Sequence, residues 1–114
     1  MIASAVFIAA GVVLLVMAAL GAWGKLPRNG FAGIRTRKTM ASADTWNVGH
    51  RAAAGYTAAA GMASIGGGIV ALFVADSGAA IVVLGLGTAV ITVTLVLLAT
   101  RRAHRAIDTM AASA

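Results

Sequence analysis

The chain has few side chains that could act in catalysis or bind a metal. Their spacing along the sequence indicates whether they could form such a site. Cysteine is absent, and the two histidines, His50 and His104, lie far apart in the sequence. Asp76 and Asp108 are isolated from each other. A metal site needs clustered ligands, and catalysis needs a nucleophile or base beside an orienting partner. We therefore expect no enzymatic activity, no metal and no cofactor.

A run of three glycines, Gly66 to Gly68, shares only its composition with a phosphate-binding loop. That loop requires a Lys followed by Ser or Thr, whereas Ile69 and Val70 follow here. The run also lies inside a long apolar segment without ionisable residues. Ionisable groups within membrane spans usually mark the pathway of proton- or cation-coupled transporters, so their absence counts against that class.

The basic residue Arg35 lies in a stretch built for a defined turn. Pro27 and Asn29-Gly30 favour a turn before it, and Arg35 itself stands between Ile34 and Thr36. A guanidinium can clamp a phosphate, a carboxylate or backbone carbonyls with two parallel hydrogen bonds. We therefore expect Arg35 to make fixed, bidentate hydrogen bonds, either to carbonyls that close the loop or to an anionic partner group. The alternative is a topology signal with contact to anionic headgroups, worth ~1 kcal/mol per basic residue.

The chain contains three uncharged apolar segments, at 2–23, 52–74 and 79–100. These segments must position the loop that carries Arg35. Each exceeds the roughly 20 residues that a helix needs to cross a hydrocarbon core of about 30 Å. Of all 114 residues 61% are hydrophobic and only 11% are charged, against about 25% in soluble domains. The sequence predicts a single all-α domain over 1–114, with three transmembrane helices and a basic loop at 24–51.

The basic residues predict the orientation of these helices. All nine lie outside the three spans. They are Lys25, Arg28, Arg35, Arg37, Lys38 and Arg51 in the loop, and Arg101, Arg102 and Arg105 in the tail at 101–114. The positive-inside rule then places the loop and the C-terminus in the cytoplasm and the N-terminus outside. The first segment lacks the basic n-region of a signal peptide, so we expect it to be retained as a span.

The second helix is predicted to begin before its span. Ser42 is typical of a helix N-cap, and Asp44 would interact favourably with the helix dipole in the first turn. We expect the helix to begin near Ala43 and to enter the bilayer after Arg51. Trp46, like Trp23, is expected at headgroup depth, where indole rings are favoured.

Small residues recur four apart in the second span. The repeats are Ala60, Ser64 and Gly68, and Ala63, Gly67 and Ala71. Such spacing lets helix backbones approach closely. The face that they form could pack against the other two helices, against a second copy or against another membrane protein, and packing within the chain is favoured.

The loop residues resemble the signature of the SdpI-like (Sdp immunity protein) family of bacterial membrane proteins. That pattern combines Lys-Ile/Leu-Pro-x-Asn, Gly-Ile-Arg-Thr, a further Thr, a Ser/acidic helix start, and Trp before a His/Asn-Arg/Lys pair. The matching residues are Lys25, Pro27, Asn29, Gly33, Ile34, Arg35, Thr36, Thr39, Ser42, Trp46, His50 and Arg51. The resemblance implies a bacterial inner-membrane protein; the family's namesake protects against a secreted toxic peptide and signals by holding a repressor at the membrane.

Three functions follow from these observations. The leading hypothesis is a non-catalytic interaction or regulatory protein whose contact surface is the loop around Gly33–Thr39. The second is a structural accessory subunit of a larger membrane complex, and the third is a small oligomeric transporter. Expected partners are membrane lipid, another membrane protein or a second copy, and a cytoplasmic regulator. Nucleic acid is not expected, because no aromatic residue lies between Arg35 and Lys38.

Overall fold

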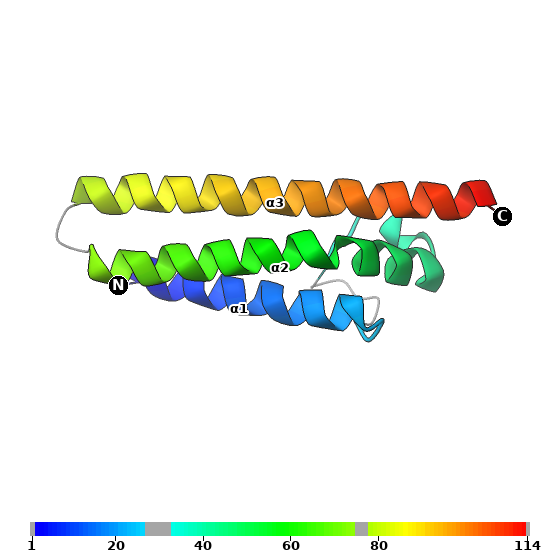
Figure 1. Cartoon of the computed structure of the whole chain (residues 1–114), viewed down its shortest axis with the longest axis horizontal. Helices are drawn as coiled ribbons and strands as arrows, with labels where there is room; N and C mark the ends of the chain where they lie inside the picture. Colours follow the sequence, from blue (N-terminus) through cyan, green and yellow to red (C-terminus); the bar gives the residue numbers. More distant parts are fainter. Residues whose placement is uncertain (1, 27–32, 75–77, 114) are drawn as a thin grey trace.

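The fold is an elongated bundle of three helices, seen in a computed structural model that describes residues 2–26, 33–74 and 78–113. Helix α1 spans Ile2–Ala22, α2 spans Ala43–Phe73 and α3 spans Gly78–Ser113, with a short 3-10 helix, η1, at Thr39–Ala41. The bundle measures 56 × 21 × 20 Å, and α2 packs against both α1 and α3 (Figure 1). Each of the three helices is long and apolar enough to cross a membrane, which confirms the predicted fold class.

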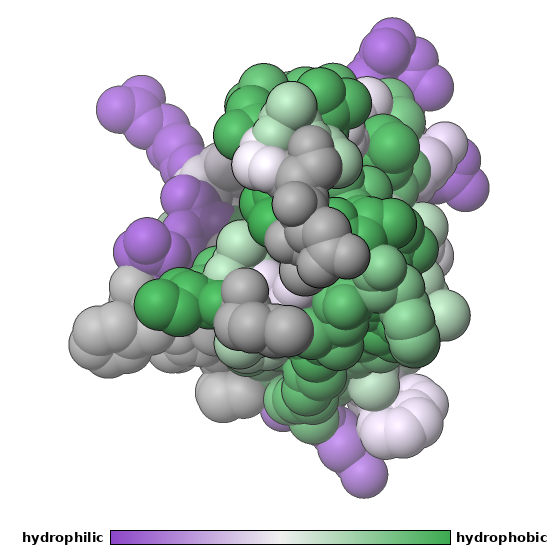
Figure 2. Space-filling model, turned by 90° about the vertical axis from the view of Figure 1, so that its left-hand side faces the viewer, coloured by the Kyte–Doolittle hydropathy of each residue, from purple (hydrophilic) through white to green (hydrophobic). Residues whose placement is uncertain are grey.

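Large apolar side chains cover the outside of the bundle. Val83 of α3 is 71% exposed, and Leu86, Val90 and Leu97 on the same helix are also exposed. Viewed from the end that carries the N-terminus, apolar side chains dominate the surface (Figure 2). A soluble protein rarely exposes so large an apolar surface, whereas lipid is a suitable solvent for it.

The predicted start of α2 is confirmed by its cap. The hydroxyl of Ser42 accepts a hydrogen bond from the backbone N–H of Thr45 at 3.0 Å, and the Ser42 N–H donates to the Thr45 hydroxyl at 2.9 Å. This reciprocal pair satisfies two donors that a helix end would otherwise leave free. Asp44 lies in the first turn. The cap fixes the direction in which α2 leaves the loop.

Small residues bring α2 close to α1. Ala60 and Ser64 are buried, and the Ser64 hydroxyl donates to the Phe7 carbonyl of α1 at 2.7 Å. A Cβ at Gly68 would lie 2.9 Å from the Ser4 carbonyl oxygen, so the two backbones nearly touch there. Ala71 continues this buried face.

Gly67, also on α2, faces α3 and not α1. A Cβ at this position would collide with the side chain of Thr88 on α3. Glycines of α2 therefore contact both flanking helices.

Helix α3 extends beyond its predicted span. The residues from Arg101 onward, expected as a tail, continue the helix to Ser113. The reason is packing, because Ala103 and Ile107 are buried, and both contact the α2 backbone where Gly49 leaves room. The loop before α2 packs against this extension of α3.

Candidate functional site

The loop before α2 is held in shape by the side chain of Thr39, which is fully buried. Its hydroxyl donates to the Ile34 carbonyl at 2.6 Å and accepts from the Thr36 N–H at 2.9 Å. In turn, the Thr39 carbonyl accepts a hydrogen bond from the Thr45 hydroxyl at 3.2 Å. These bonds tie the loop to the α2 cap, so residues 34–45 form one hydrogen-bonded unit.

His50 and Trp46 attach this unit to the bundle. The backbone N–H of Ile34 donates to Nε2 of His50 at 2.8 Å, and Nδ1 of His50 lies 2.8 Å from the Trp46 carbonyl. The Trp46 indole N–H donates to the Leu26 carbonyl at 2.8 Å. Trp46 is only 1% exposed, so its indole packs inside the protein and does not face lipid headgroups as an interfacial side chain would.

Gly33 makes this packing sterically feasible. Its φ of +106° is a conformation that side chains disfavour, and a Cβ here would lie 2.6 Å from Nε2 of His50. The same Cβ would lie 3.1 Å from the Trp46 ring. The backbone at Gly33 therefore lies directly against the His50–Trp46 pair, whose rings are 4.1 Å apart.

The extension of α3 contributes two further contacts. The Thr36 hydroxyl is within 2.8 Å of Nε2 of His104, and the Lys38 ammonium forms a salt bridge with Asp108 at 2.8 Å. The side chains of the salt bridge are 47% and 61% exposed, so it adds little stability. The Thr36–His104 contact is thus a second link between the loop and α3.

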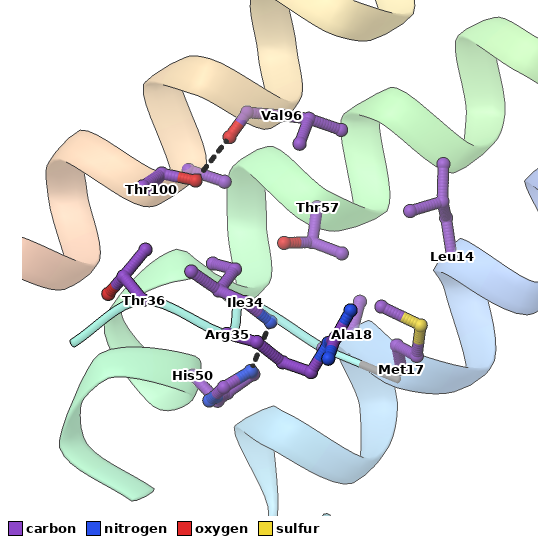
Figure 3. A pocket seen from close by; sticks show the side chains of 12 residues that line it. Leu14, Met17, Ala18, Ile34, Arg35, Thr36, His50, Thr57, Val96 and Thr100 are labelled. Atoms are coloured by element: carbon purple, nitrogen blue, oxygen red, sulfur yellow. Dashed lines mark hydrogen bonds between the residues drawn. The ribbon is translucent and has the colours of Figure 1, made fainter. Parts of the chain in front are cut away.

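A cavity of about 190 Å³ lies beneath the loop, between α1 and α3 (Figure 3). Met17 and Ala18 of α1 form one wall, and Val96 and Ala99 of α3 form another. The Arg35 side chain also lines the cavity. Its guanidinium is drawn toward α1, away from the His50 hydrogen bond (Figure 3).

Within the described residues, Arg35 does not close the loop. Its side chain is exposed, and its guanidinium makes no hydrogen bond or ion pair with any residue in 2–26, 33–74 or 78–113. Thr39 and His50 make the loop-closing hydrogen bonds that we expected from it. The other expectation, binding of an anionic partner group, stays a prediction.

The remaining predicted residues divide into two groups. Gly33, Ile34, Thr36, Thr39, Trp46 and His50 converge on one face of α2, whereas Arg51 is exposed at its edge. Pro27 and Asn29 lie outside the described residues. The packing residues Ala60, Ser64, Gly67, Gly68 and Ala71 lie further along α2, away from the loop.

Sequence reasoning missed the contribution of α3 to this site. The sequence places His104 far from His50 and gives it no partner, and it does not mark Ala99, Ala103 and Ile107 as buried, which they are. Their spacing of four residues on one helix face is the signal that would have found them. Leu26, whose carbonyl accepts from Trp46, has no comparable signal, because a backbone acceptor leaves no pattern in the sequence.

The described residues also limit the chemistry of the site. Among them, no group of three or more His, Cys, Asp or Glu side chains lies close enough to hold a metal ion. Both ring nitrogens of His50 are engaged in hydrogen bonds with the backbone. The site therefore offers an exposed cationic side chain, Arg35, beside an apolar cavity, which is an arrangement suited to binding.

Comparison with known proteins gives one match. The sequence model described as the SdpI/YfhL protein family matches residues 25–99, which include the loop, all of α2 and much of α3. No curated protein and no solved structure matches the chain significantly.

Proposed function

This chain belongs to the SdpI/YfhL protein family, and on that premise we propose that it is a non-catalytic interaction or regulatory protein of the bacterial inner membrane. Its contact surface is the exposed side of the loop Gly33–Thr39, which carries Arg35 and Arg37. Immunity or signalling of the kind implied by the family's namesake would use this surface.

The observation that carries the proposal is the contrast between the two sides of the loop. The inward side is fixed by Thr39, at 0% exposure, and by the hydrogen bond between Ile34 and His50. The outward side carries Arg35 and Arg37, both exposed. A surface held rigid before binding loses less conformational entropy on binding, and arginine suits the recognition of carboxylates and phosphates.

The charge distribution supports a cytoplasmic position for this surface. All nine basic residues of the chain lie in the loop, at the start of α2 or in the last turns of α3. The described parts of these three regions lie at the same end of the bundle (Figure 1). With the positive-inside rule, that end and the C-terminus are cytoplasmic and the N-terminus is outside. The partner is then a cytoplasmic regulator or the cytoplasmic face of another membrane protein, with acidic groups opposite the arginines.

The alternative of a structural accessory subunit has less support. It requires the small-residue face of α2 to be available to a partner. Ala60 is buried instead, Ser64 donates a hydrogen bond to α1, and Gly67 contacts α3.

The test is capture of partners with a charge-matched control. The tagged full chain is purified in mild detergent from cells that express it at native level, as wild type and as two double variants. Arg35→Glu with Arg37→Glu changes the loop, and Arg101→Glu with Arg102→Glu makes the same change of charge on α3. We expect a partner that co-purifies with the wild type and the α3 variant but not with the loop variant. Equal recovery from both variants would rule out the loop as the contact surface.

A further inference from the structure

The cavity beneath the loop is apolar on its helical walls and has one charged side chain among the described residues that line it. Met17, Ala18, Val96 and Ala99 supply apolar surface from α1 and α3. Arg35 is the charged group, and no acidic side chain is found among the described lining residues. A site with this polarity suits a ligand that has an apolar body and an anionic end.

The other polar side chains at the cavity already have partners. The Thr57 hydroxyl donates to the Ala53 carbonyl at 3.0 Å, and the Thr100 hydroxyl donates to the Val96 carbonyl at 3.1 Å. Both nitrogens of His50 are engaged, as described above. These polar side chains in the cavity wall therefore need no further hydrogen-bond partner. An apolar chain can lie against them without leaving buried polar groups unsatisfied.

Arg35 differs from these groups. Its five N–H donors make no hydrogen bond to the part of the chain that the structure describes. A phosphate or carboxylate presents paired oxygen atoms that match the guanidinium geometry. Charge complementarity at this position thus favours an anion.

The position of the cavity indicates where that anion comes from. Thr100, in its wall, directly precedes Arg101 and Arg102, where the apolar part of α3 ends. The cavity thus extends from Leu14 and Val96, within the apolar spans, to Thr100 at the end of one span, and lipid phosphates lie beyond the ends of such spans. Its volume of about 190 Å³ is smaller than the roughly 300–1,000 Å³ of pockets that enclose drug-sized ligands. It has room for part of one acyl chain.

We propose that this cavity is a binding site for an anionic phospholipid, with one acyl chain between α1 and α3 and the phosphate on Arg35. The inference goes beyond the proposed function, because a lipid can bind the purified chain without any protein partner. A bound phosphate would hold the Arg35 side chain in one geometry within the contact surface. Lipid binding would therefore influence how the loop presents itself to a partner.

The test measures lipid binding to the purified full chain by native mass spectrometry in mild detergent. Phosphatidylglycerol is the anionic probe and phosphatidylcholine the zwitterionic one. Arg35→Gln removes the proposed phosphate ligand, and Arg37→Gln is the control, since Arg37 is exposed and does not line the cavity. We expect Arg35→Gln to weaken phosphatidylglycerol binding by about tenfold, which corresponds to about 1.4 kcal/mol. Arg37→Gln should stay within about twofold of the wild type, since it loses only a weak surface interaction.

A second pair of variants tests the acyl chain. Val96→Phe places a larger side chain in the cavity, and Val93→Phe makes the same change on the exposed surface of α3. We expect only Val96→Phe to weaken binding. Glycerol phosphate, which has the anion without the chains, should not displace the lipid from the wild-type protein, a result that does not depend on how any variant folds.

Three outcomes would overturn the proposal. They are phosphatidylglycerol binding that is unchanged by Arg35→Gln, equal binding of phosphatidylcholine, and displacement by glycerol phosphate. The last would indicate a surface anion site without an acyl chain. Lipid binding that is absent, together with partner capture that still depends on the loop, would contradict the lipid site but not the proposed function.

Discussion

Ile34 donates its backbone N–H to the imidazole of His50 at 2.8 Å, and this bond joins the loop to the second turn of α2. The other ring nitrogen lies 2.8 Å from the Trp46 carbonyl, which can only accept. The ring therefore carries its proton on Nδ1 and accepts at Nε2, as a neutral tautomer. His50 is thus a structural bridge between two parts of the backbone.

We predict that His50→Ala destabilises the protein by about 1–3 kcal/mol, because the Ile34 N–H loses its acceptor in a partly buried position. Thermal unfolding in mild detergent, followed by circular dichroism, measures the change. His104→Ala is the control, since its partner, the Thr36 hydroxyl, keeps a second contact with Thr39. Equal losses in the two variants would contradict the bridging role of His50.

Gly33→Ala should also lower stability, by about 1–3 kcal/mol, because φ at this residue is +106° and the new methyl group would press on His50 and Trp46. Gly66→Ala is the matched control. A Cβ there meets nothing within 4 Å, and alanine favours helix over glycine. The same unfolding assay should show no loss for Gly66→Ala, and a harmless Gly33→Ala would mean that the loop does not hold this backbone conformation.

The sequence predicted the helices far better than it predicted the site. Apolar length is a local property, so the three spans and the Ser42 cap could be identified directly. The long-range pairs could not, because nothing near Trp46 or His50 specifies a carbonyl or an N–H many residues away. Of the two kinds of hydrogen bond that the sequence predicts for Arg35, Thr39 makes the one that closes the loop, and a buried threonine hydroxyl gives no distinctive pattern in the sequence.

A third prediction concerns the contact between α1 and α2. Gly68→Leu should disrupt the bundle, because a Cβ at this position would already lie 2.7 Å from the Ile8 side chain and 2.9 Å from the Ser4 carbonyl oxygen. Overpacking of this kind typically costs about 1–3 kcal/mol or more. Gly66→Leu, on an exposed part of the same helix, should be tolerated. Resistance to unfolding in mixed detergent micelles distinguishes the two variants, and equal resistance would contradict the assigned face.

The orientation of the chain is a fourth prediction. Reporters fused after residue 114 and at Ser77 should show the C-terminus in the cytoplasm and the connection between α2 and α3 outside. The reason is that the basic residues that the structure describes lie at the opposite end of the bundle from the end of α2 and the start of α3. A phosphatase reporter, active only outside, and a fluorescent reporter, active only inside, should give opposite results at the two sites. Cytoplasmic activity at Ser77 would overturn the topology.

The last prediction separates geometry from charge at Arg35. Because the Arg35 side chain is exposed and has no hydrogen bond within the described residues, Arg35→Lys should leave the unfolding midpoint unchanged. Lysine keeps the charge but loses the planar fork that binds two oxygen atoms at once. We therefore expect Arg35→Lys to weaken binding of the partner nearly as much as Arg35→Ala does.

Arg37→Lys is the control for that comparison, because Arg37 is equally cationic and exposed, and lysine keeps the positive charge that Arg37 contributes to the contact surface. Its partner binding should match that of the wild type in the same co-purification assay, read out by quantitative mass spectrometry. If Arg35→Lys also matches the wild type, a positive charge is all that the position requires. Arg35 would then act only as one more basic residue that sets topology, and the loop would lose its role as a geometric recognition surface.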